Sequence, residues 1–208
     1  MTDYSVARSM EATTAAAAAQ MDRRRAAHPN GWWGMVVFVA TEATLFGTLV
    51  GTYFYLRFES AHWPPPGVPK PHLTLPLVLT AALVLTSIPV QLSFASARRA
   101  RVGAARFFLL AALVVQAGYF AMQLHLFAHD VHLSPPHETA YSSIYFTLLG
   151  AHHFHVAVGM LLELWLLLRL LGGLSNYRLI GLQATAFYWH FVNTLAIVVV
   201  LTQLSPRV

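Results

Sequence analysis

The sequence predicts an all-α polytopic membrane protein with five transmembrane helices, its N-terminus in the cytoplasm and its C-terminus outside. Three observations predict this class. Of the 208 residues, 57% are hydrophobic and 10% are charged, whereas soluble domains carry about 25% charged residues. Five apolar runs of about 24–28 residues are each long enough to cross a hydrocarbon core about 30 Å thick. Most Lys and Arg residues would lie on one side of such a bundle.

The composition also excludes several classes of function. The net charge is +5, but 13 Lys and Arg residues with 8 Asp and Glu residues are too few to form a broad basic surface. We therefore expect no nucleic-acid partner. The chain has no cysteine, which excludes disulfides, thiolate metal sites and thiol catalysis.

The elements follow from the apolar runs. Residues 1–30 form a polar, alanine-rich tail, and residues 31–208 are expected to form one five-helix bundle. The first run is too long for the apolar part of a signal peptide and contains Glu42, so it should be retained as a span. The spans are expected at residues 32–57, 73–96, 104–127, 143–170 and 181–204.

Glycine and proline mark the connections and one irregularity. Pro64-Pro65-Pro66-Gly67, Pro135-Pro136 and Gly172-Gly173 each indicate a turn between spans. Pro89 lies inside the second span and predicts a kink there, because proline cannot donate the helical hydrogen bond.

The orientation follows from the positive charges, which favour the cytoplasmic side. With the N-terminus inside, ten Lys and Arg residues would lie inside and three outside. The inner ones are Arg8, Arg23, Arg24, Arg25, Arg98, Arg99, Arg101, Arg106, Arg169 and Arg178. The outer ones are Arg57, Lys70 and Arg207.

Several ionisable and polar residues lie inside the expected spans, where charge is costly and therefore points to function. They form a candidate carboxylate–histidine cluster: Glu42, His152, His155, Glu163, His190 and Asn193. One interpretation is a proton relay through this cluster, because imidazole titrates near neutral pH. The other is a set of interhelical hydrogen bonds that hold the bundle together. The residues alone leave both open.

The outer connections are rich in histidine. Spacings of four and three would place His125, His129 and His132 on one helical face, which His137 could join. Such a face could bind a metal, or could be an exposed histidine-rich edge, and we assign no metal site. His152 and His155 lie on one helix and cannot bind one haem from both sides. His190 with one of them could, but nothing in the sequence requires it, so no haem is expected on this chain.

Three residues are candidates for lipid contact. Arg169, at the inner end of the fourth span, could bind a lipid phosphate or extend to the interface. Trp32 and Trp33 are typical interfacial anchors.

Three motifs in order resemble subunit III of the haem–copper respiratory oxidases. Trp32-Trp33-Gly34-Met35 leads into Ala40-Thr41-Glu42-Ala43. Residues 150–156, Gly-Ala-His-His-Phe-His-Val, with Gly159, resemble the family's G-x-H-G-x-H-V-x-x-G. Residues 188–193, Tyr-Trp-His-Phe-Val-Asn, resemble Y-W-H-F-V-D. The motifs extend over residues 31–208, and the length resembles the short, five-helix bacterial form.

The resemblance implies a non-redox subunit of a cytochrome c or quinol oxidase in the bacterial cytoplasmic membrane. Haem and copper would lie on partner subunits, with subunit I as the main contact, subunit II in the same complex and a respiratory supercomplex possible. The chain would hold phospholipid, sustain proton uptake into subunit I and protect the enzyme during turnover.

The resemblance also implies roles for single residues. Glu42 falls at the family's intramembrane carboxylate, and His152 is expected near it. Arg169 matches the lipid-phosphate arginine, with Trp32 and Trp33 lining the same lipid region.

The chain departs from the family pattern by losing acidic groups. Asn193 stands in place of an aspartate, Gln183 in place of a frequent glutamate, and His153 in place of the motif glycine. These changes weaken an argument for proton collection by this chain. They leave room for a divergent relative, such as a subunit-III-like accessory protein of a nitric oxide reductase. A small proton-coupled transporter that uses Glu42 and the histidines is a further alternative.

Overall fold

The computed structural model of the chain describes residues 30–68 and 74–205. Its regular elements in those ranges are all helices, and five helical stretches are long and apolar enough to cross a membrane. The predicted all-α, five-span class is thereby confirmed. Nearly all of the expected polar tail, together with Lys70 and Arg207, lies outside the described residues.

The helices begin and end close to the predicted spans. Their bounds are α2 Asn30–Glu59, α3 Thr74–Leu85, α4 Ser87–Arg98, α5 Val102–Leu133, α6 Ala140–Leu171 and α7 Asn176–Leu204. The helices α5 and α6 each have 32 residues, which corresponds to about 48 Å of helix. Both therefore extend beyond a hydrocarbon core about 30 Å thick.

Side-chain caps fix the start of the last two long helices. The Thr139 hydroxyl accepts a hydrogen bond from the Ser142 backbone N–H, and the Ser175 hydroxyl accepts one from the Arg178 N–H. Each cap satisfies an amide that has no partner within its own helix. Gly173, with φ of +93°, turns the chain after α6, a conformation that glycine adopts at no steric cost.

The second span divides into α3 and α4 at Thr86, as Pro89 predicts. Pro89 lies in the first turn of α4 and has no N–H to donate to the Leu85 carbonyl. Thr86 is buried, and its hydroxyl donates to the Leu83 carbonyl and accepts from Trp189 Nε1 at 2.9 Å. The break therefore also forms a point of attachment to α7.

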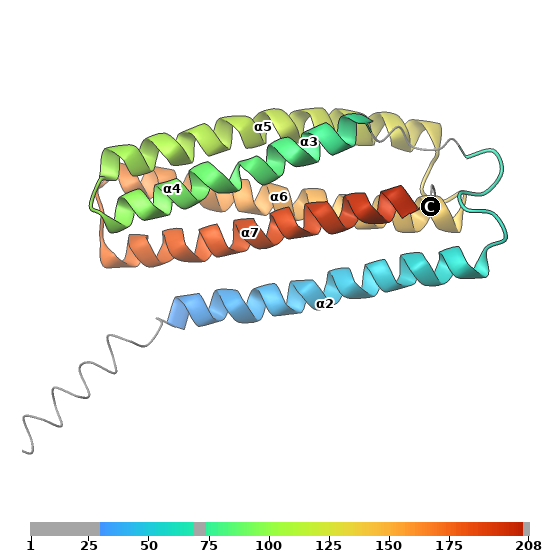
Figure 1. Cartoon of the computed structure of the whole chain (residues 1–208), viewed down its shortest axis with the longest axis horizontal. Helices are drawn as coiled ribbons and strands as arrows, with labels where there is room; N and C mark the ends of the chain where they lie inside the picture. Colours follow the sequence, from blue (N-terminus) through green and yellow to red (C-terminus); the bar gives the residue numbers. More distant parts are fainter. Residues whose placement is uncertain (1–29, 69–73, 206–208) are drawn as a thin grey trace, which may run out of the picture.

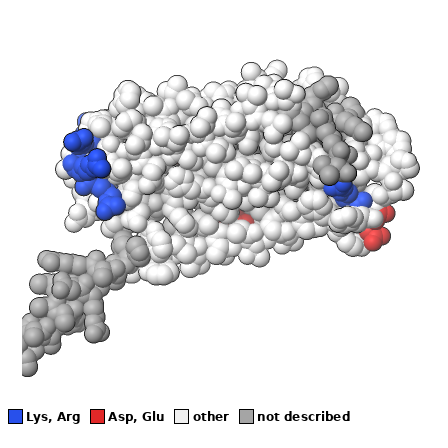
Figure 2. Space-filling model, viewed as in Figure 1, with Lys and Arg blue, Asp and Glu red and all other residues white. Residues whose placement is uncertain are grey.

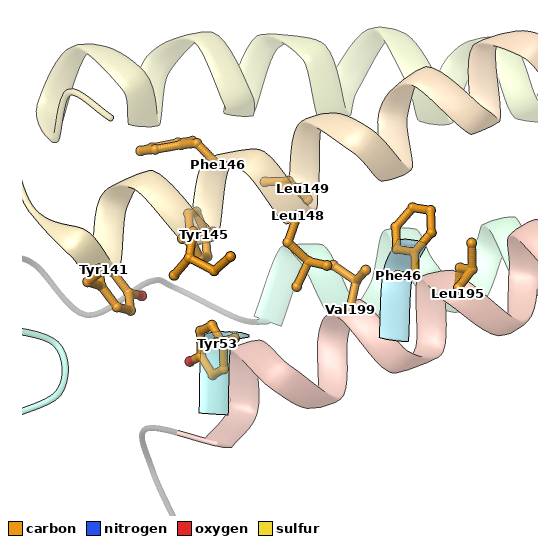
Figure 3. Packing of buried hydrophobic residues seen from close by; sticks show 10 residues of the cluster. Phe46, Tyr53, Tyr141, Tyr145, Phe146, Leu148, Leu149, Leu195 and Val199 are labelled. Carbon is orange, nitrogen blue, oxygen red and sulfur yellow. The ribbon is translucent and has the colours of Figure 1, made fainter. Parts of the chain in front are cut away.

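The helices form a bundle of α3–α4, α5, α6 and α7, with α2 along one side of it (Figure 1). Among the helices, α2 contacts α6 and α7. Phe46 and Tyr53 are its buried residues, and Figure 3 shows both within a cluster that includes Leu148 and Val199. Most of the surface of α2 is thus open to lipid or to another protein.

The helices α6 and α7 pack tightly against each other at Gly159. A Cβ added at Gly159 would come within 2.7 Å of the Trp189 ring, a separation that real Cβ atoms do not show. The indole of Trp189, which is fully buried, therefore occupies the space that Gly159 leaves free.

Candidate functional site: an intramembrane carboxylate–histidine pair

Glu42 and His155 form an ion pair or hydrogen bond between α2 and α6. Glu42 lies one helical turn before the buried Phe46 and therefore on the face of α2 that meets the bundle. Its Oε2 lies 2.8 Å from His155 Nε2. The side chains are 19% and 7% exposed, respectively, so both are largely withdrawn from the surface.

The other ring nitrogen of His155 fixes how the pair is protonated. His155 Nδ1 lies 2.7 Å from the Ala151 carbonyl oxygen, and because a carbonyl only accepts, Nδ1 must carry a proton. The contact between Nε2 and Oε2 then requires one further proton. A protonated Glu42 donates it to a neutral ring, or an imidazolium donates to the carboxylate. Two acceptors would repel, so one proton lies between Nε2 and Oε2 in this geometry.

Aromatic groups and one backbone contact hold the imidazole in place. The Phe46 ring lies edge-on to the His155 ring, with centroids 5.2 Å apart. The Tyr188 hydroxyl of α7 donates to the His155 carbonyl oxygen at 3.1 Å. Three helices therefore position the pair.

The pair borders a groove between α2 and α6. The groove has a volume of about 600 Å³ and is mainly apolar. Its other lining residues include Phe38, Leu45, Thr147, Phe154, Val158 and Tyr188. In Figure 2 the middle of the molecule is almost uniformly uncharged. A proton-carrying group in such a setting can exchange only with what enters the groove.

The partner of Glu42 is His155 and not His152, which the family resemblance had placed near the carboxylate. His152 lies three residues earlier on α6, borders a different cavity and is 2% exposed. Neither of its ring nitrogens has a hydrogen-bond partner among the residues that the structure describes.

The remaining polar residues of the expected cluster make separate contacts. Glu163 is fully buried and accepts a hydrogen bond from Gln116 Nε2 of α5 at 3.2 Å. Because it lies eight residues beyond His155 on α6, the two are about 12 Å apart along the helix. The Glu163–Gln116 pair therefore connects α5 and α6 at a site of its own.

Two contacts connect α7 to α4. His190 Nε2 lies 3.2 Å from Gln91 Oε1, and Asn193 Nδ2 donates to Ser87 Oγ at 2.6 Å. The polar residues that were expected to form one cluster therefore form separate pairs, and these pairs lie at different helix interfaces. Gln91 and Gln116 were not among the expected site residues. Their polar side chains within the otherwise apolar second and third spans were the sequence feature that could have identified them as partners of His190 and Glu163.

The outer histidines are exposed side chains. His125, His129, His132 and His137 are all exposed, and His129 lies 3.6 Å from Asp130. Within residues 30–68 and 74–205, no three His, Asp or Glu side chains come together as metal ligands.

The candidate lipid residues lie at the end of the bundle opposite to the outer histidines. The guanidinium of Arg169 lies 4.8 Å from the Trp165 ring and 6.0 Å from the Tyr177 ring, an arrangement that favours the cation. The Trp32 ring lies 6.1 Å from the Phe187 ring of α7 and 5.0 Å from the Trp33 ring.

Arg106 has a role that the sequence did not indicate. Its Nε and Nη2 donate to the Leu170 carbonyl oxygen at 3.0 and 2.6 Å. A cation beside the last carbonyls of a helix stabilises its C-terminus. Arg106 thus caps α6 from α5, besides contributing to the charge asymmetry.

The fold and these pairs define a class, a five-span integral membrane protein with one proton-holding pair and further polar pairs at its helix interfaces. A match to the family described as cytochrome c oxidase subunit III covers residues 12–203. The chain belongs to the cytochrome c oxidase subunit III family.

Individual relatives agree with this match. Cytochrome c oxidase subunit 3 of Synechocystis is 30% identical over 178 residues, which cover 82% of this chain and 74% of the relative. Quinol oxidase subunit 3 of Bacillus subtilis is 28% identical over 168 residues, covering 78% and 79%. Cytochrome bo(3) ubiquinol oxidase subunit 3 of Pseudomonas aeruginosa is 29% identical over 174 residues, covering 80% and 82%.

Proposed function

We propose that this chain is the non-redox third subunit of an aerobic terminal oxidase in a bacterial cytoplasmic membrane. The family match over residues 12–203 carries the proposal, and the five spans agree with it. The chain would associate with subunits I and II, on which haem and copper would lie. Some relatives are subunits of cytochrome c oxidases and others of quinol oxidases. They support an oxidase but do not indicate which electron donor it uses.

The charges support an orientation with the N-terminus inside. In Figure 2, basic side chains gather at the end of the bundle where α4 meets α5 and α6 meets α7. Arg98, Arg99 and Arg101 lie at the first of these connections. Positive charge favours the cytoplasmic side, so we place this end there.

We further propose that the chain holds phospholipid. The groove beside α2 is mainly apolar with a volume of about 600 Å³, and Arg169 supplies an exposed cation near the proposed cytoplasmic surface. Trp32 and Trp33 lie near the same end, where indole rings favour the headgroup level. These features support lipid contact along α2, α6 and α7.

The pair of Glu42 and His155 supports a role in sustaining proton uptake and stable turnover. It holds one proton inside the membrane, at a groove wall. Such a pair can buffer protons near a partner, whereas it has no electron-transfer chemistry of its own.

Copurification tests the subunit assignment. The tagged chain, extracted from its membrane in mild detergent, should bring down a large polytopic protein with haem absorbance. Sequencing that partner distinguishes an oxidase from a nitric oxide reductase. Proton flux through liposomes that contain this chain alone, abolished by Glu42→Gln, would instead support a transporter.

A substitution tests the role of the pair in the complex. Glu42→Gln should leave the initial rate of electron transfer largely unchanged but shorten the time over which the oxidase remains active. The control is Glu59→Gln, the same change at the exposed end of α2, which should behave as wild type. Equal turnover lifetimes for both variants would contradict the proposed role.

A further inference from the structure

A second cavity lies inside the bundle, apart from the groove at Glu42. Its volume is about 280 Å³, and its lining comes from α3, α5, α6, α7 and Val68. On α6 the lining extends from Tyr141 and Ser142 to His152. Ten residues of helix separate Ser142 from His152, so the cavity is about 15 Å deep.

Polar residues line the mouth of the cavity, among apolar ones that include Val68 and Leu133. The mouth lies at the end of the bundle where α5 finishes and α6 begins, and is lined there by Asp130, Ser134, Gln203 and the exposed His129. A hydrogen bond of 2.8 Å joins the hydroxyl of Ser134, which directly follows α5, to that of Ser142 in α6. Such a rim is readily wetted, because hydroxyl, amide and carboxylate groups can all bind water.

His152 lines the deep end. It is 2% exposed, and both ring nitrogens are without a hydrogen-bond partner in the described part of the chain. Buried polar atoms are rarely left unpaired, and ordered water commonly satisfies them. The cavity is the space from which water can reach this ring.

Further polar groups line the walls between the mouth and His152. Tyr119, Gln123, Tyr145 and Thr80 all line the cavity, and Gln123 Nε2 donates to the Tyr119 hydroxyl at 3.4 Å. Buried water typically makes about three hydrogen bonds, and these groups supply donors and acceptors at successive depths. The apolar walls alone would leave the cavity dry.

We propose that this cavity is a water-filled inlet that brings protons from the Ser134 end of the bundle to His152. Hydronium in the inlet gives its proton to the unprotonated ring nitrogen of the neutral His152 and becomes water. The reverse step returns the proton to water. His152 is then a proton-exchanging group distinct from the pair of Glu42 and His155.

The titratable groups that face His152 or the inlet come from two helices. From α5 they are Tyr119, His129 and Asp130; from α6 they are Tyr141, Tyr145 and the neighbouring His153 and His155. The lining residues of α3 and α7 include the polar but non-titrating Thr80 and Gln203. Among the described residues that line the inlet, Asp130 is the one carboxylate.

Deuterium exchange at the imidazole C2 position tests the inlet, with a control next to it in the chain. His153 is also buried and its ring nitrogens are unpaired among the described residues, but it packs against Phe127 and does not line the cavity. In the complex with which the chain copurifies, His152 should exchange more than about tenfold faster than His153, since exchange follows water access. Tandem mass spectrometry assigns the deuterium to one ring or the other.

Two outcomes overturn the proposal. Exchange at His152 that is as slow as at His153 means that the cavity is dry. Equally fast exchange at both means that local opening of α6, and not an inlet, admits water. Failure of either kind leaves the subunit assignment untouched, because that assignment rests on the family match and on copurification.

The absence of cysteine permits a second measurement. Val199 lines the cavity, whereas Val192, two turns earlier on α7, is fully buried in another cluster. With a small water-soluble methanethiosulfonate, which reacts with the ionised thiol, Val199→Cys in the complex should be labelled and Val192→Cys should not. Equal labelling of the two, or no labelling of Val199→Cys, contradicts a hydrated cavity.

Discussion

At the scale of the residue, the contact between Glu42 and His155 is a joint proton site that also fastens two helices. The tautomer that the Ala151 carbonyl imposes leaves room for one shared proton between Oε2 and Nε2. Because both side chains are mostly buried, removing one leaves the other with an unmet hydrogen bond.

A double-mutant cycle measures this coupling. Glu42→Leu and His155→Leu should each lower the free energy of unfolding by about 1–3 kcal/mol, the cost of a buried unpaired polar group. The loss of unfolding free energy in the double variant should be smaller than the sum of the two single losses, because no buried polar group is left without a partner. Unfolding of the purified chain by SDS gives the three values, and strict additivity would show that the two groups do not interact.

Sequence reasoning identified the ionisable residues of the spans but not which of them meet. His152 and His155 lie three positions apart, so either could have faced α2, and the rotation of α6 decides between them. That rotation depends on the packing of Gly159 against Trp189 and on the contact from Tyr188. The positions of Gln116 and Ser87 relative to α6 and α7 depend on the same long-range packing.

At the scale of the element, the sequence was more informative. The structure has a long apolar helical stretch for each of the five expected spans, because apolar length is a property of a single segment. The break between α3 and α4 follows from Pro89, since a missing N–H acts locally. The extra turns of α5 beyond residue 127 were not predicted, because His129, Asp130 and His132 interrupt the apolar run without interrupting the helix.

The contact between α6 and α7 gives a prediction for Gly159→Ala. The added methyl would overlap the Trp189 ring and force the helices apart, which should destabilise the chain by about 1–3 kcal/mol. Gly118→Ala on α5 is the control, because a Cβ there meets nothing within 4 Å. Thermal unfolding in detergent should show a lower midpoint for the first variant, and equal midpoints would contradict the close approach.

The break in the second span gives another prediction. Thr86→Val keeps the shape of the side chain but removes the acceptor for Trp189 Nε1, at a cost of about 1–3 kcal/mol for the unpaired buried donor. Thr44→Val removes a hydroxyl that bonds within its own helix at an exposed position and should cost much less. Unfolding by SDS compares the two, and tryptophan fluorescence should shift for Thr86→Val.

At the scale of the whole molecule, the distribution of charge predicts how the chain crosses the membrane. Arg101 lies between α4 and α5, and His137 lies between α5 and α6, at opposite ends of α5; both are exposed. In spheroplasts, a membrane-impermeant maleimide should label His137→Cys, but should label Arg101→Cys only after lysis. The reverse pattern would invert the proposed orientation.

The position of α2 also has a consequence for biosynthesis. Of the described helices α2 is made first, yet its helix contacts are with α6 and α7, which are made last. Until α6 leaves the ribosome, α2 has no helix of this chain to dock on, and Glu42 is without His155. The packing of α2 against the bundle is therefore completed only after α6 and α7 have been synthesised.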